Sequence, residues 1–104
     1  MSKEIKFLTE RIEEEIHDAK LYAKMAAEYK NEFPALSHVL YTISTQEETH
    51  QEMLHAEAVK LIEAYRKEHG NPPPAMMAVY QHLHEKAIEK MAEAKHYQEI
   101  YKKA

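Results

Sequence analysis

The residues of this chain best suited to chemistry are a glutamate and a histidine three positions apart. Glu47-Glu48-Thr49-His50 forms a Glu-x-x-His pair, and on a helix this spacing places both side chains on one face. Apolar residues flank the pair at alternating spacings of three and four, so Glu47 and His50 occupy positions where leucine is expected. With Ile43 set at 0°, they fall at about 40° and about 340°. The pair is predicted to point into the apolar face of its own helix.

A third candidate ligand, Glu15, lies in the preceding segment. It interrupts an apolar arc that contains Ile12 and Ala19. An unpaired buried carboxylate is costly and takes up a proton if nothing compensates it. No Lys or Arg lies on the apolar seams between Leu8 and Ala26 or between Leu36 and Leu61. We therefore expect a cation from solution to compensate these glutamates.

The donor set indicates which metal this cation is. Two glutamates and one histidine form half of the ligand set of di-iron carboxylate bundles. Oxygen donors with one imidazole suit Fe or Mn better than a structural zinc site. One chain is too poor in ligands for two metals, but two copies supply four glutamates and two histidines. We predict a homodimer at minimum, forming a higher homo-oligomer, with two Fe per dimer (one per chain) and Mn as the alternative metal.

The elements that position these residues are predicted to be helices. The chain has 104 residues with only one Gly and four Pro, and its abundant Ala, Glu, Lys, Leu and Met favour helix. Breaks at 31–34 and 69–74, marked by Pro and Gly, divide it. The prediction is a single all-α domain of residues 1–104: two long antiparallel amphipathic helices, 3–30 and 34–69, and a third C-terminal helix, 74–103.

Composition excludes several classes of function. The formal net charge is −4, with acidic and basic residues interspersed, so neither nucleic acid nor a membrane is expected as a partner. The sequence contains no cysteine, which rules out thiolate metal sites and disulfides. No signal-peptide pattern and no membrane-spanning apolar run occur. A soluble, intracellular, cytoplasmic protein is expected.

Two motifs in this chain resemble those of a known family. Glu15, followed seven positions later by Tyr22, resembles the first-helix motif of ferritin-like and rubrerythrin-like proteins. Glu47-x-x-His50 resembles their second-helix motif. A single copy of the two in a short chain is similar to the encapsulated ferritins, where a di-iron ferroxidase site forms between two subunits. The resemblance covers about Leu8 to Leu61 and implies a four-helix ferritin-like bundle completed by dimerisation.

The resemblance also implies an activity and residue roles. The activity is that of a ferroxidase, which oxidises Fe(II) to Fe(III) for iron storage or detoxification. Glu15, Glu47 and His50 would be the catalytic iron ligands, and Tyr22 would hydrogen-bond to a ligand. Glu14 and His17 occupy the positions of carboxylates of an outer site through which iron reaches the centre, with His17 replacing one carboxylate.

Other polar residues are weaker candidates. Glu57 also lies on the second seam and is either an accessory ligand or a partly exposed residue. Glu93-x-x-His96 repeats the spacing but falls off the apolar arc, so it is expected on the solvated surface. The remaining histidines are interpreted as surface or boundary residues: His38, His55, His69, His82 and His84.

Two alternative functions stay open. One is a rubrerythrin-like di-iron peroxidase, ranked lower because a chain without cysteine cannot hold a rubredoxin-type iron centre. The other is a metal-free helical oligomerisation or adaptor protein whose glutamates are protonated or hydrogen-bonded to each other. The C-terminal residues 98–104 are helical and polar in pattern, so residence inside an encapsulin shell is not indicated.

Overall fold

The computed structural model describes residues 2–103, which form three helices. These are α1 (Ser2–Tyr29), α2 (Pro34–His69) and α3 (Pro74–Lys102), and no strand occurs among the described residues. The all-α class is confirmed, and each helix bound lies within one residue of its prediction. Met1 and Ala104, the ends of the predicted domain, lie outside the described residues. Within residues 2–103, no helix combines the length and apolar character needed to cross a membrane.

Both chain reversals follow from local sequence. Pro34 opens α2, where its missing N–H would have no intrahelical partner in any case. Just before it, the Phe33 N–H donates to the Tyr29 carbonyl, and the two rings pack edge to face at 6.0 Å. After α2, Gly70 takes a φ of 77°, a left-handed conformation that glycine adopts without strain. The three prolines that follow prevent α2 from continuing.

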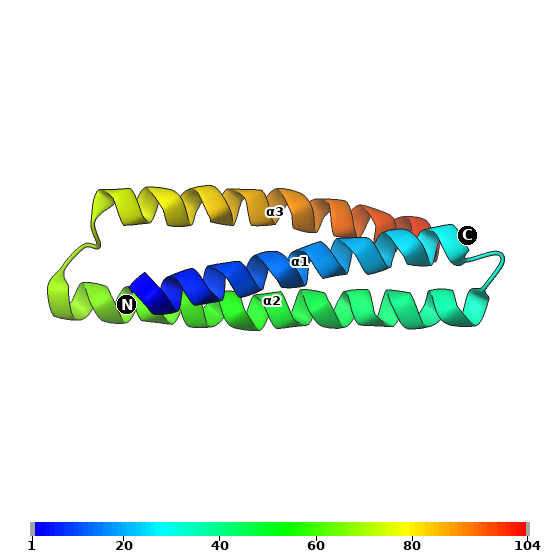
Figure 1. The fold of residues 1–104 in the computed structure, drawn as a ribbon, viewed down its shortest axis with the longest axis horizontal. Coiled ribbons are helices and arrows are strands. Elements are labelled where there is room, and N and C mark those ends of the chain that lie inside the picture. Colours follow the sequence, from blue (N-terminus) through cyan, green and yellow to red (C-terminus); the bar gives the residue numbers. More distant parts are fainter. Residues whose placement is uncertain (1, 104) are drawn as a thin grey trace.

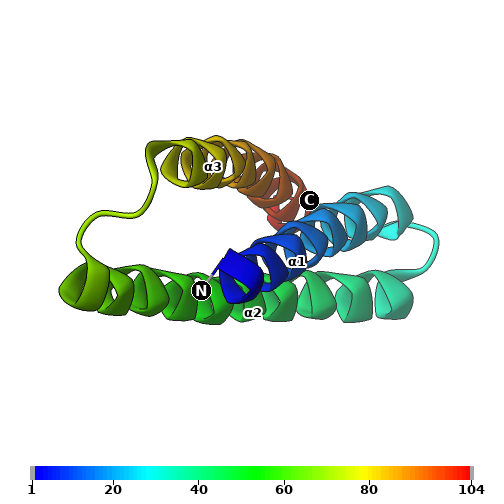
Figure 2. The same ribbon diagram turned by 60° about the vertical axis from the view of Figure 1, so that its left-hand side comes forward.

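The three helices form an elongated bundle with extents of 56 × 18 × 18 Å. Figure 1 shows α1 lying between α2 and α3, with each helix antiparallel to the next in sequence. The view in Figure 2 shows that α3 stays beside α1 near its C-terminal end and diverges from α2 toward its N-terminal end. As a result, α2 and α3 do not pack against each other along their full lengths.

Small residues allow α1 and α2 to approach closely. Ala19, Ala23 and Ala26 on α1 are completely buried. Facing them, the Ser44 hydroxyl of α2 donates to the Ala19 carbonyl at 2.7 Å, and the Ser37 hydroxyl donates to the Ala26 carbonyl. These two bonds satisfy the buried hydroxyls and set the register between the antiparallel helices.

This close contact rotates the buried face of α2 away from the seam predicted by its large apolar residues. The buried residues of α2 are mostly small ones: Ser37, Leu40, Ser44, Ala58 and Ile62. Leu36, on the predicted seam, is 46% exposed. The predicted centre of the buried face was wrong, because it was placed at the large apolar residues. Two helices approach most closely where their side chains are small. The predicted seam runs along the edge of the buried face.

One side of the α1–α2 pair is covered by α3. Near the C-terminal end of α3, the Gln98 amide donates to the Ser44 hydroxyl at 3.0 Å, and Tyr101 stacks on Tyr41 at 4.6 Å. Lys95 of α3 lies 3.4 Å from the Glu48 carboxylate. Since Glu47 is about 100° around α2 from Glu48, it lies toward the side of the pair that α3 leaves open.

Candidate metal centre

The structure brings together the three predicted ligands, Glu15 of α1 with Glu47 and His50 of α2. Each offers one ligand atom, and these atoms all lie within 4.8 Å of one another. Among residues 2–103, this is the only group of three or more His, Cys, Asp or Glu side chains arranged in this way. Residues distant in sequence therefore converge as the spacing predicted.

The helix register explains the convergence. In the antiparallel pair, the Ser44–Ala19 hydrogen bond fixes one point of contact. One turn along α2 from Ser44 lies Glu47, and one turn back along α1 from Ala19 lies Glu15. The two carboxylates consequently meet across the helix pair.

The carboxylates are largely buried, but the imidazole is open to solvent. The side chains of Glu15 and Glu47 are 16% and 18% exposed, and that of His50 is 53% exposed. His50 Nδ1 lies 3.4 Å from Glu15 Oε2 and 3.8 Å from Glu47 Oε1. His50 was expected to point into the apolar face, but its side chain lies at the edge of that face. The reason is that the buried face of α2 is centred away from the predicted seam.

The two carboxylates perturb each other's ionisation. The hydrogen bond with Glu15 raises the pKa of Glu47 to about 7, and burial acts in the same direction. The same contact with Glu47 lowers the pKa of Glu15, with smaller help from His50 and Arg11. Two adjacent carboxyl groups do not both ionise readily without a cation. The raised pKa of Glu47 favours one proton on the pair below about pH 7, and a bound metal ion would replace that proton.

Arg11 is a neighbour of the cluster that lies off the predicted apolar seam. Its Nη2 lies 3.5 Å from Glu15 Oε1, and its Nη1 lies 2.6 Å from Glu14 Oε2. No Lys or Arg lies on the seam itself, but this long side chain, one turn away, reaches Glu15 along the helix from outside the apolar arc. Glu15 has a partial counterion in Arg11, whereas Glu47 has none among these contacts.

The other predicted site residues lie outside the cluster. Tyr22 is half-buried, and within the described chain no hydrogen bond joins it to the three ligands. Glu14 is exposed and paired with Arg11, and His17 is exposed. Glu57 is also exposed and pairs with Lys60 at 3.1 Å. The roles of Tyr22, Glu14 and His17 stay predictions, and Glu57 is an exposed residue, as one of its two interpretations stated.

The remaining candidates divide between surface and interior. Glu93 pairs with Lys20 of α1 at 2.5 Å, and His96 is exposed, so this second Glu-x-x-His lies on the surface as predicted. His55 and His84, interpreted as surface or boundary residues, are half-buried and stack on each other with ring centroids 4.7 Å apart. Sequence gave no signal for this contact, since the two histidines lie on different helices.

No protein-family model, curated protein or solved structure matches this chain. The donor set itself nevertheless restricts the chemistry. Two carboxylates and one imidazole suit Fe or Mn. With metal–ligand bonds of about 2.1 Å, ligand atoms on opposite sides of an ion lie about 4.2 Å apart. The observed spread of ligand atoms fits a single divalent ion after slight tightening.

Proposed function

We propose that this chain is a ferritin-like, iron-binding ferroxidase that oxidises Fe(II) to Fe(III) at a di-iron site shared between two copies, for iron storage or detoxification. The observation that carries the proposal is the convergence of Glu15, Glu47 and His50, in which both carboxylates are largely buried. Mn is the alternative metal. The following features support the proposal.

The position of the cluster favours a shared site. It lies toward the side of the α1–α2 pair that α3 leaves open, where His50 is 53% exposed and Leu36 is 46% exposed. A second copy that packs its own α1–α2 pair against this side would complete a four-helix bundle. Two-fold symmetry would then bring four glutamates and two histidines together. Four carboxylates offset the charge of two divalent cations, which makes burial of the completed site tolerable.

Each residue has a distinct part in the proposed reaction. Glu47 gives up its proton as Fe(II) arrives, and its carboxylate then binds the cation. Arg11 orients Glu15 toward the site, and His50 offers an imidazole nitrogen to the metal. Iron is the substrate: two Fe(II) ions give up two electrons, and one O2 with two protons becomes one H2O2. The protein contributes geometry and a pocket poor in water.

Aerobic iron oxidation tests the proposal directly. Fe(II) is added to the protein in air, and the rise in near-ultraviolet absorbance is followed for the wild type, Glu47→Ala and Glu57→Ala. We expect Glu47→Ala to slow oxidation roughly 100-fold or more, because it removes a ligand directly. Glu57→Ala, which changes an exposed residue outside the cluster, should match the wild type. If wild type and Glu47→Ala are equally inert, the metal-free adaptor function replaces the ferroxidase.

A further inference from the structure

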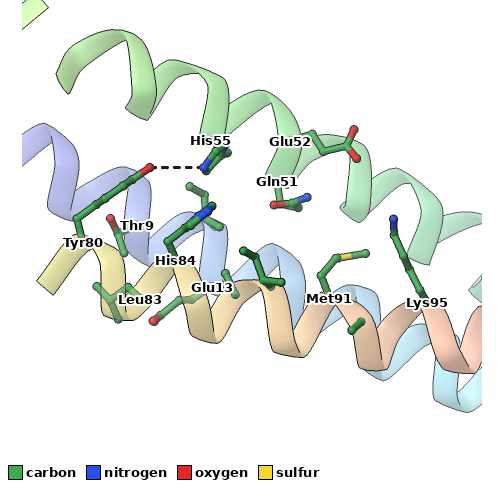
Figure 3. A pocket seen from close by; sticks show the side chains of 14 residues that line it. Thr9, Glu13, Gln51, Glu52, His55, Tyr80, Leu83, His84, Met91 and Lys95 are labelled. Atoms are coloured by element: carbon green, nitrogen blue, oxygen red, sulfur yellow. Dashed lines mark hydrogen bonds between the residues drawn. The ribbon is translucent and has the colours of Figure 1, made fainter. Parts of the chain in front are cut away.

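A second cluster of polar aromatic residues connects α2 and α3. Figure 3 shows His55 of α2 beside Tyr80 and His84 of α3. The His55 and His84 rings stack with centroids 4.7 Å apart and planes 18° apart. The Tyr80 hydroxyl lies 3.4 Å from His55 Nε2, and its ring is nearly parallel to that of His84.

This contact lies at one end of a cavity of about 420 Å³ between the three helices. At the other end lies Lys95, which is paired with Glu48. Apolar residues such as Ile12 and Met91 line the space between. The cavity leaves room beside the two imidazoles for water molecules, which a metal ion needs where protein ligands are few.

The charged residues that line this cavity include two acidic ones. Carboxylates line the cavity from two helices, Glu13 from α1 and Glu52 from α2, and the ammonium group of Lys95 is occupied by Glu48 at the far end. Glu52 precedes His55 by three positions, the spacing that also relates Glu47 to His50. Burial, and secondarily the nearby His84, lowers the pKa of His55. A neutral imidazole offers one ring nitrogen to a metal ion.

We propose that His55 and His84 bind a borderline divalent cation such as Zn²⁺, which fastens the diverging half of α3 to α2. Imidazole nitrogens suit Zn²⁺, Ni²⁺ and Cu²⁺. With metal–nitrogen bonds of 2.0–2.1 Å, the two nitrogens lie roughly 3 Å apart. The two rings are stacked with centroids 4.7 Å apart, so binding requires the stack to open until one nitrogen of each ring faces the ion, and water from the cavity completes the coordination.

This cation site is independent of the proposed ferroxidase. The two sites share no residue, and their donors differ. The proposed iron site offers mainly carboxylate oxygens, whereas His55 and His84 offer imidazole nitrogens. The test therefore uses the full chain carrying Glu47→Ala, in which the first site has lost a ligand. Failure of the zinc proposal would leave the ferroxidase proposal unaffected, and the converse also holds.

Zinc binding is measured by calorimetric titration and by thermal unfolding in the Glu47→Ala background. We expect one Zn²⁺ per chain. Zinc at about 100 times its dissociation constant should raise the melting temperature by roughly 10 °C or more. His84→Phe keeps a ring in the stack but removes the nitrogens, so it should abolish both effects, and His55→Phe should do the same.

The matched control is His82→Phe, which alters an exposed histidine on the same helix. It should bind zinc as the Glu47→Ala parent does. Circular dichroism without zinc confirms that each variant is helical before the comparison. The proposal is overturned if the parent shows no rise in melting temperature, or if the rise persists in both His84→Phe and His55→Phe.

Discussion

Two regions of α2 carry the same Glu-x-x-His spacing and are built differently. At Glu47 and His50, the carboxylate is largely buried and meets a second carboxylate, Glu15, while the imidazole is half open. At Glu52 and His55, the carboxylate is exposed and the half-buried imidazole meets a second imidazole from α3. The difference shows that a ligand spacing on one helix does not define a site. The neighbouring helix decides which member of the pair is buried, and so which donors converge.

The two regions also differ in how they respond to protons. In the α1–α2 cluster, the raised pKa of Glu47 means that the folded state holds a proton which the unfolded chain releases near pH 4.5. At the α2–α3 contact, the lowered pKa of His55 means that the folded state releases a proton which the unfolded chain still holds near pH 6.5. The α1–α2 cluster therefore stabilises the folded state more at low pH, and the α2–α3 contact stabilises it more at high pH. Experiments can exploit this opposition.

The largest expected effect is metal-dependent dimerisation through the α1–α2 cluster. If ions bind only the associated state, two ions at about ten times their dissociation constants tighten the dimer roughly 100-fold. Anaerobic Fe(II) or Mn(II) should therefore increase the mass measured by sedimentation or light scattering. His50→Ala should abolish this shift, whereas His82→Ala should not. A wild-type chain that stays monomeric with metal would contradict a site shared between copies.

The second prediction concerns the stability of the metal-free protein between pH 6 and pH 8. Glu47 has a folded pKa of about 7 against 4.5 in the unfolded chain. The stability that protonated Glu47 contributes is fully present below about pH 4.5, falls as pH rises toward 7 and levels off above 7, so the loss between pH 6 and pH 8 is about 1–2 kcal/mol. Glu15, with a lowered pKa, acts only below pH 4.5 and does not contribute in this window. Urea unfolding at several pH values measures the slope.

Glu47→Gln is the matched variant for this slope, because its amide keeps the size of the side chain and cannot ionise. It should flatten the pH dependence between pH 6 and pH 8. Saturating metal should flatten it in the wild type too, since the ion replaces the proton. Equal slopes for the wild type and Glu47→Gln would show that Glu47 is not the titrating group.

These two experiments depend on a cluster whose main members could be identified from sequence. Glu15, Glu47 and His50 interrupt apolar periodicity, and such interruptions are visible without a structure. The helix bounds were equally accessible, because Pro34, Gly70 and the three prolines after it mark them. By contrast, Arg11 lies off the apolar arc, so periodicity did not indicate it, although its i, i+4 spacing to Glu15 on a helix is visible in the sequence.

The α2–α3 contact was not accessible from sequence. His55 and His84 show no interruption of a large apolar stripe, and their contact depends on how far α3 diverges from α2. The close approach of α1 to α2 was equally hidden, because it depends on Ser44 and the small residues of α1. Hydrophobic periodicity reports which face is buried, but small polar residues such as Ser44 escape it. For the same reason the predicted seam of α2 was displaced from its buried face.

The third prediction concerns the α2–α3 contact, which should be weakened when the pH is lowered. Because the folded state holds fewer protons at His55 than the unfolded chain, the stability of the α2–α3 contact is lost as pH falls below about 6.5. In the Glu47→Gln background, amides in the first half of α3 should lose hydrogen-exchange protection at pH 5.5 relative to pH 7, after correction for intrinsic exchange rates. His84→Phe should reduce this difference. Protection that falls equally along all three helices would indicate global unfolding and contradict a local effect.

The smallest effect is expected at the far end of the cavity, where Lys95 pairs with Glu48. The Lys95 side chain is 61% exposed, and exposed ion pairs contribute about 0.2–1 kcal/mol. Lys95→Met keeps most of the apolar stem, so it should change the free energy of unfolding by about 0.5 kcal/mol or less and leave zinc binding unchanged. Glu48→Gln is the matched change on the partner side, and urea unfolding measures both. A loss above about 2 kcal/mol for Lys95→Met would mean that this ion pair, and not the Ser44–Gln98 contact beside it, holds α3 against α2. The His55–His84 contact and the Lys95–Glu48 ion pair would then both hold α3 against α2 along the cavity.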